Sequence, residues 1–130
     1  TFNTNISSDV LPASNKTYNL GSNTEQWKTL HVETIVLDTT DIATSSADSN
    51  TSLSKINSTS DITISLADGA EGQQKIITVT EPLSASVFLT PSSSRGYTSI
   101  SFTNAGDSAI IVFINGSWNI VSVFRASVIA

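Results

Sequence analysis

The chain has 130 residues, which is enough for one modest domain, or for a small domain with an extended segment. It is 38% hydrophobic but only 13% charged, which is a low charged fraction for a soluble domain. Its polar residues are instead mostly serine and threonine, with 23 and 17 copies. The net charge of −5 is too small to favour disorder. The lack of cysteine excludes disulfides and thiolate metal sites. The absence of a basic cluster argues against nucleic-acid binding.

Residues 1–41 are predicted to form an extended arm or stalk with widely spaced apolar side chains. Its most distinctive stretch, YNLGSNTEQWKTLHV (18–32), begins with a turn, where Gly21 would allow a sharp bend. So thin a segment has few residues of its own against which these apolar side chains could pack. Burying one large apolar side chain nevertheless stabilises a protein by roughly 1.5–3 kcal/mol. We therefore expect symmetry-related copies to cover these side chains. The predicted oligomer interface consists of Tyr18, Leu20, Trp27, Leu30 and Val32.

Residues 42–60, IATSSADSNTSLSKINSTS, are almost all small and polar, and we interpret them as a linker. Two arrangements are open. The segment is either a flexible spacer, or its Ile42, Leu53 and Ile56 dock within an intertwined oligomer. The composition fits both equally well.

Residues 61–130 have the pattern of consecutive strands in one β domain. Apolar runs predict strands at 61–66, 74–80, 84–90, 97–103, 108–114, 118–124 and 126–130. Asn115-Gly116 predicts a type I′ hairpin, with Trp118 in the core behind it. The unbroken run SAIIVFI, residues 108–114, is typical of a strand covered on both faces. The expected fold is all-β, in which the arm precedes an antiparallel meander that forms a β-sandwich or a barrel-like head.

No catalytic, cofactor-binding or metal-binding residues are predicted. His31 is the only histidine, and one histidine without cysteine does not make a zinc site. Asp38 with Asp41, and Asp68 with Glu71, offer oxygen ligands, but a surface turn is the simpler interpretation of each pair. Neither a nucleophile elbow nor a phosphate-binding loop occurs. We expect a protein that is not an enzyme, needs no cofactor and, lacking a run of 18 apolar residues, does not insert into membranes.

Aromatic side chains leave one alternative function open. Flat rings can stack on sugar faces, so Tyr18, Trp27, Tyr97 and Trp118 could form the platform of a carbohydrate-binding module. Core packing is the competing interpretation, and we favour it for Trp118. A glycan-cleaving enzyme is disfavoured, because it would need two acidic residues facing each other in a groove.

Residues 10–35, VLPASNKTYNLGSNTEQWKTLHVETI, resemble a repeat found in tail fibres and other fibrous virion proteins of bacteriophages and large DNA viruses. The shared pattern is a proline, a polar turn, a Leu-Gly-Ser segment and a tryptophan that precedes a short strand. The matching positions are Pro12, Tyr18, Leu20, Gly21, Ser22, Trp27, Leu30 and Val32. Gln26 departs from the pattern, because a basic residue often precedes the tryptophan.

Residues 66–122 resemble a β domain that recurs in viral and phage structural proteins. The resemblance lies in Asp68-Gly69 followed by Glu71-Gly72, and in the stretches ITVT (77–80), FTNAGDSA (102–109) and NGSWNIVS (115–122).

Together the two resemblances imply a structural protein of the virion: a fibre, spike or capsid-surface component that serves assembly and host attachment. They imply an intertwined homotrimer with an N-terminal stalk or collar and a C-terminal head. The implied partners are other copies of the chain, other virion proteins, and a host-surface glycan or receptor. We expect the loops at 67–74, 91–97 and 104–107 to make the outward contacts, because loops on a rigid scaffold tolerate variation.

Overall fold

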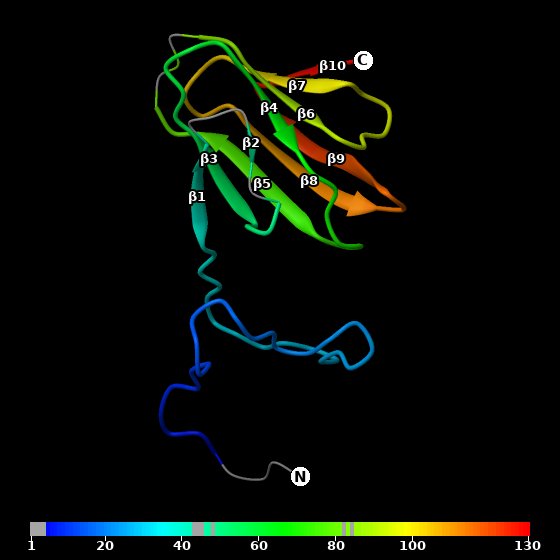
Figure 1. Ribbon diagram of the computed structural model, residues 1–130. Helices are drawn as coiled ribbons and strands as arrows, with labels where there is room; N and C mark the ends of the chain where they lie inside the picture. The colour runs from blue at the N-terminus through cyan, green and yellow to red at the C-terminus, as the bar shows by residue number, and fades with distance from the viewer. Residues whose placement is uncertain (1–4, 43–45, 48, 82, 84) are drawn as a thin grey trace. The chain divides into compact units, whose positions relative to one another are not determined.

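The computed structural model describes residues 5–42, 46–47, 49–81, 83 and 85–130 (Figure 1). The chain divides into two compact units, residues 1–35 and residues 36–130. Residues 5–35 are built from turns and bends, and none of them belongs to a helix or strand. All the strands among the described residues lie in the second unit, and these residues include no helix.

The second unit consists of two five-stranded sheets (Figure 1). Sheet A contains, in spatial order, β1 (Thr39–Ile42), β3 (Leu53–Ile56), β5 (Gln74–Val79), β8 (Ser108–Ile114) and β9 (Ser117–Phe124). Sheet B contains, in spatial order, β10 (Ser127–Ile129), β7 (Ser99–Phe102), β6 (Val87–Pro91), β4 (Ile62–Leu66) and β2 (Ser46–Ala47). The expected all-β class is confirmed, and each strand predicted after residue 60 is present with similar bounds.

The pairing of these strands differs from the predicted meander. From β1 to β6 the chain crosses to the opposite sheet after every strand, so β1, β3 and β5 are parallel neighbours in sheet A. In the same way β2, β4 and β6 are parallel neighbours in sheet B. The pairs β5–β8, β8–β9, β6–β7 and β7–β10 are antiparallel. The prediction of a wholly antiparallel domain is therefore wrong. Parallel neighbours need a long crossover connection, and here a strand of the opposite sheet serves as that connection.

The two sheets pack against each other through alternate side chains. In β5, Ile77 and Val79 are buried while Thr78 between them is partly exposed. The buried core consists of Ile42, Ile56, Ile64, Leu66, Ile77, Val79, Val87, Leu89, Tyr97, Ile100, Phe102, Ala109, Ile111, Phe113 and Trp118. Because both sheets contribute to this cluster and neither closes on itself, the arrangement is sandwich-like and not a barrel.

The hairpin between β8 and β9 is of the predicted type. Asn115 and Gly116 have φ angles of 50° and 75°, as a type I′ turn requires. Trp118 behind them is fully buried, and its ring meets that of Phe113 edge-on with centroids 5.3 Å apart. The indole N–H donates to the carbonyl of Ala67 at 3.0 Å. The prediction that Trp118 belongs to the core is confirmed.

The segment 42–60, interpreted above as a linker, lies within the second unit. Ile42 ends β1 and Ile56 ends β3, and both are buried in the core, whereas Leu53 at the start of β3 is half-buried. Residues 43–45 and 48 lie outside the described residues. Along the chain, the boundary between the two compact units falls between Ile35 and Val36.

A buried lysine explains why so polar a segment belongs to a sheet. Lys75 in β5 is fully buried, and its Nζ donates to the carbonyl of Thr51 at 2.7 Å and to Ser54 Oγ at 2.8 Å. Ser54 Oγ also lies 2.9 Å from Thr40 Oγ1 of β1. Since a buried ammonium group needs hydrogen-bond partners, the hydroxyl groups of this segment serve the interior of sheet A.

Candidate functional site

The N-terminal unit exposes an unusual amount of apolar surface. Nine large apolar side chains among residues 5–35 are between 51% and 78% exposed: Ile6, Val10, Leu11, Tyr18, Leu20, Trp27, Leu30, Val32 and Ile35. Exposed apolar side chains are normal when scattered singly, but a contiguous group indicates a contact surface.

A tight turn positions Trp27 within this unit. The N–H of Ser22 donates to the carbonyl of Glu25 at 2.9 Å, and Ser22 Oγ accepts the N–H of Glu25 at 3.0 Å. Gly21 has a φ angle of +88°, which favours glycine. A Cβ atom at Gly21 would lie 3.1 Å from the Glu25 carbonyl oxygen and 3.4 Å from Trp27 Cδ1. Glycine is thus favoured both by the backbone angle and by the close approach of the Glu25 carbonyl oxygen.

The exposed side chains form an apolar groove with a volume of about 740 Å³. Its lining consists of Ile6, Val10, Leu11, Pro12, Tyr18, Asn19, Leu20, Trp27 and Leu30. We call this feature the apolar groove. Four of the five residues predicted for the oligomer interface line it together, and the fifth, Val32, is exposed but does not line it. The polar side-chain groups in this lining are the Asn19 amide, the Tyr18 hydroxyl and the Trp27 indole N–H.

Of the three loops predicted to make outward contacts, those joining β4 to β5 and β6 to β7 lie together beside the β8–β9 hairpin. The Glu71 carboxylate accepts the N–H of Asn115 at 3.0 Å. Arg95 Nη2 donates to the Asn115 carbonyl at 2.9 Å, and the Arg95 N–H donates to the Trp118 carbonyl at 3.2 Å. The third loop, between β7 and β8, lies at the other end of β5, because the N–H of Gly106 donates to the carbonyl of Val79, the last residue of that strand. The three loops therefore do not form one surface.

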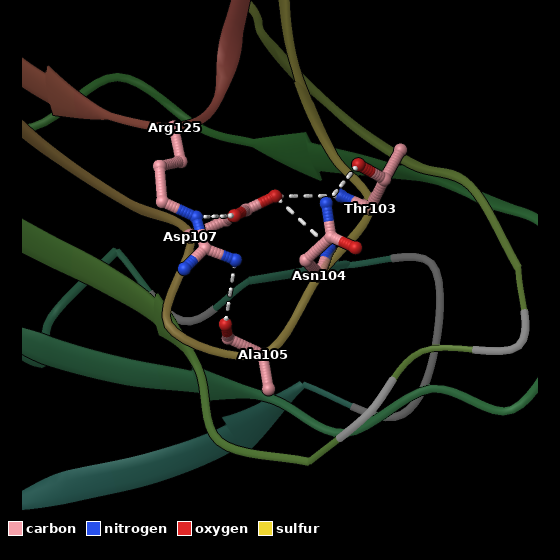
Figure 2. Close-up of polar contacts among 5 residues, drawn as sticks. All are labelled: Thr103, Asn104, Ala105, Asp107 and Arg125. Carbon is pink, nitrogen blue, oxygen red and sulfur yellow. Dashed lines mark hydrogen bonds and ion pairs between the residues drawn. The ribbon is translucent and has the colours of Figure 1, made fainter.

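Asp107 closes the β7–β8 loop (Figure 2). Its side chain is fully buried, and Oδ2 accepts the backbone N–H groups of Thr103 and Asn104, each at 2.9 Å. On the other side of the carboxylate, Arg125 Nε lies 3.5 Å from Oδ1, while Arg125 Nη2 donates to the Ala105 carbonyl at 3.3 Å. This cluster joins the loop to the chain that follows β9, which is a structural role.

The candidate cation ligands considered from the sequence are otherwise engaged or scattered. Asp41 forms an ion pair with Lys55 at 3.2 Å, and Glu71 binds the Asn115 backbone. His31 is exposed. Among the described residues no group of three or more His, Asp or Glu side chains could hold a metal ion. That part of the chain also contains no helix with the length and hydrophobicity needed to cross a membrane.

The four aromatic side chains considered for a sugar platform differ in exposure: two are buried and two are exposed. Tyr97 is 7% exposed, and burial raises the pKa of its hydroxyl from 10.0 to about 12. Its oxygen has no hydrogen-bond partner among the described residues. With Trp118 also buried, Tyr18 and Trp27 are the two that remain exposed, and both line the apolar groove.

No known protein family matches this chain, and no curated protein matches it either. Among solved structures, one similar chain belongs to "Structure of a chaperone-substrate complex", with 16% sequence identity and a TM-score of 0.49. The match covers 69% of this chain and 19% of that chain, so it spans about a fifth of the other chain's length. A likeness of this degree supports no statement about fold or function.

Proposed function

We propose that this chain is a non-enzymatic structural protein of a virion, a segment of a fibre, spike or capsid surface that assembles as a homotrimer. The N-terminal unit supplies the contact between copies, as a stalk or collar, and the second unit forms the head. The resemblance of residues 10–35 to virion fibre repeats supports this assignment, as does the apolar groove in the same segment.

The observation that carries the proposal is the exposure of the groove's side chains. Tyr18, Leu20, Trp27 and Leu30 are each between 63% and 75% exposed. Burying such side chains is favourable by roughly 1.5–3 kcal/mol each. Copies of the same chain arranged around a symmetry axis bring identical apolar segments together and can provide that burial.

The second unit suits the role of a head. Its two sheets enclose one continuous core, and the loops beside the β8–β9 hairpin are held by backbone hydrogen bonds. Loops fixed on such a scaffold are free to differ in sequence without loss of the fold. Within the proposal these loops contact a host glycan or receptor, or another virion protein.

Sedimentation equilibrium tests the assembly. The wild-type chain is expected to have three times the 13.7 kDa mass of one chain. Trp27→Ala is expected to shift this equilibrium towards the monomer, because it removes the largest ring of the groove. Lys28→Ala is the matched control, since Lys28 is the next residue, is exposed, and does not line the groove.

A monomeric wild-type chain at all accessible concentrations would overturn the proposal. An intact trimer in Trp27→Ala, with a mass distribution like that of Lys28→Ala, would show that the groove does not hold the copies together.

The second candidate function is a carbohydrate-binding module, because Tyr18 and Trp27 are both exposed in the lining of the apolar groove. The burial of Tyr97 removes one ring from that platform, and the many aliphatic groups in the lining favour an apolar partner. A glycan array decides between the two: sugar binding by the wild-type chain that is lost in Trp27→Ala would favour the module.

A further inference from the structure

The two outer surfaces of the second unit differ in chemistry. Five of the side chains that point away from the core in β3, β5 and β8 are aliphatic, Leu53, Ile76, Ile110, Val112 and Ile114, and they lie beside the polar Lys55, Gln74, Thr78 and Ser108. We call these five aliphatic side chains the outer face of sheet A. The corresponding positions of sheet B are mostly hydroxyl groups, from Thr63, Ser65, Thr90, Ser101 and Ser127, with Phe88 and Ile129 as the apolar exceptions.

The strand register makes the outer face of sheet A continuous. Leu53 pairs with Ile76, and Ile76 pairs with Ile110, so the three side chains form a row across β3, β5 and β8. Residues directly opposite in neighbouring strands lie on the same face. Val112 and Ile114 extend this row along β8. None of the five belongs to the buried core, and Ile114 is 41% exposed.

The pattern of β8 shows that this face lacks a cover within the second unit. Ala109, Ile111 and Phe113 point into the core, while the intervening residues of β8 are equally apolar but point outward. A strand with one solvated face normally alternates apolar and polar residues, as β4 does with Thr63 and Ser65 outward. The sequence of β8 is therefore that of a strand covered on both faces, and the second unit itself covers one of them.

We propose that the outer face of sheet A packs against the same faces of the neighbouring copies of this chain around the assembly axis, so that sheet A faces the axis and sheet B faces outward. The charge distribution selects this occupant. A chain with a net charge of −5 resists contact with itself unless the contact face is neutral. The charged side chains that point outward from the strands of sheet A are Asp41 and Lys55, which neutralise each other at 3.2 Å.

The same face is poorly suited to other ligands. Its central row contains no aromatic ring on which a sugar could stack and no excess positive charge for a nucleic acid. An aliphatic, neutral surface is, however, complementary to an identical surface. This contact is separate from the one proposed for the N-terminal unit, and either can fail without the other.

Inter-copy distances between single spin labels test the orientation. The chain contains no cysteine, so one introduced cysteine per chain is labelled uniquely. Thr78→Cys places the label on the outer side of β5, and Thr90→Cys places it on the outer side of β6. The two positions are matched, because both are half-exposed threonines in the middle strands of their sheets.

Packed sheets lie about 10 Å apart, so the distance between copies at residue 78 is expected to be shorter than that at residue 90 by at least about 10 Å. Equal distances at the two positions, or a shorter distance at residue 90, would overturn the inference. A wholly monomeric wild-type chain would overturn it as well.

Charge variants supply a second readout in the full chain. Ile110→Lys is expected to reduce the assembled fraction at least tenfold, because it places a like charge at the centre of the contact. Thr90→Lys is expected to leave the assembled fraction unchanged, and circular dichroism checks that both variants fold. An unchanged assembly in folded Ile110→Lys contradicts the inference. If Trp27→Ala keeps the assembly while Ile110→Lys loses it, the proposed N-terminal contact fails and this one stands.

Discussion

The two tryptophans of this chain follow similar turn sequences but have opposite environments. Trp118 comes after the Asn115-Gly116 turn and is fully buried, while Trp27 comes after the Gly21-Ser22 turn and is 68% exposed. The turn chemistry is local and works in both units. What differs is the supply of partners: the strands around Trp118 bring apolar residues from distant parts of the chain, whereas residues 5–35 form no strand. The comparison shows that a turn can fix the position of a tryptophan, but that its burial requires apolar residues from other parts of the fold.

The same contrast separates two kinds of mutational effect. Changes in the second unit should lower the stability of the fold, because its side chains are already buried by the chain. Changes in the N-terminal unit should leave that fold intact and act on contacts between copies. Four substitutions test this division, from the largest expected effect on stability to the smallest.

Trp118→Ala should destabilise the second unit by about 3–5 kcal/mol, since it removes a buried ring, its contact with Phe113 and the hydrogen bond to Ala67. The melting temperature should fall by more than about 10 °C. Thermal unfolding followed by circular dichroism measures this. A shift of only one or two degrees would mean that the hairpin does not depend on its tryptophan.

Asp107→Ala should cost about 1–3 kcal/mol, because the backbone N–H groups of Thr103 and Asn104 lose their acceptor and Arg125 loses its ion-pair partner. Urea unfolding gives the value. Arg125→Ala is the informative companion: it leaves the buried carboxylate with its two N–H donors, and should also destabilise the unit. If neither variant changes the midpoint, the cluster does not stabilise the loop.

Tyr97→Phe should change the pH dependence of stability more than its value at neutral pH. The hydroxyl is buried without a hydrogen-bond partner among the described residues, so its removal should be neutral or slightly stabilising at pH 7. The pKa of Tyr97 is raised from 10.0 to about 12, so between these values the unfolded chain ionises while the folded chain does not. Wild-type stability should therefore fall as the pH rises from about 10 to about 12, and Tyr97→Phe should lose this component of the fall. Urea unfolding at pH 9 and pH 11.5 separates the two proteins; parallel losses in both would contradict the assignment to Tyr97.

Trp27→Ala should have the smallest effect on the fold. Because Trp27 lies in the other unit and is largely exposed, the melting temperature of the second unit is expected to stay within about 2 °C of wild type when both chains are measured as monomers. Calorimetry of dilute samples checks this. A loss comparable to that of Trp118→Ala would show that the second unit depends on the N-terminal unit for its stability.

The positions of the strands after residue 60 and the β8–β9 hairpin could be predicted from the sequence, but β1, β2, β3 and the other strand pairings could not. Alternation in DITISL and the Asn-Gly turn are local signals, and the structure contains the corresponding β4 and the β8–β9 hairpin. Whether β4 pairs with β5 or lies in the other sheet depends on contacts with residues far away in the sequence, and in the structure β4 pairs with β2 and β6. The place of residues 42–60 in the sheets could not be predicted for a similar reason. Ser54 looks like a linker residue in the sequence, and only the fold shows that it accepts a hydrogen bond from the buried Lys75.

For the candidate site, the sequence indicated side chains without partners, and Tyr18, Leu20, Trp27 and Leu30 do lie exposed in one groove. The separation of the loops and the burial of Tyr97 depend on the tertiary fold, and no local pattern marks them. The outer face of sheet A had a visible sign, the unbroken apolar run of β8, but only the register with Leu53 and Ile76 shows that the exposed half of that run is part of a wider surface.

Hydroxyl-radical footprinting of the full chain, with oxidation of Trp27 and Trp118 measured in the same sample over a concentration series, tests the central claim most directly. Trp118 should be protected at every concentration, because the chain itself buries it. Trp27 should be protected in the concentrated, assembled sample and should become reactive when dilution separates the copies. If Trp27 reacts like a fully exposed tryptophan at all concentrations, the apolar groove is not a contact between copies.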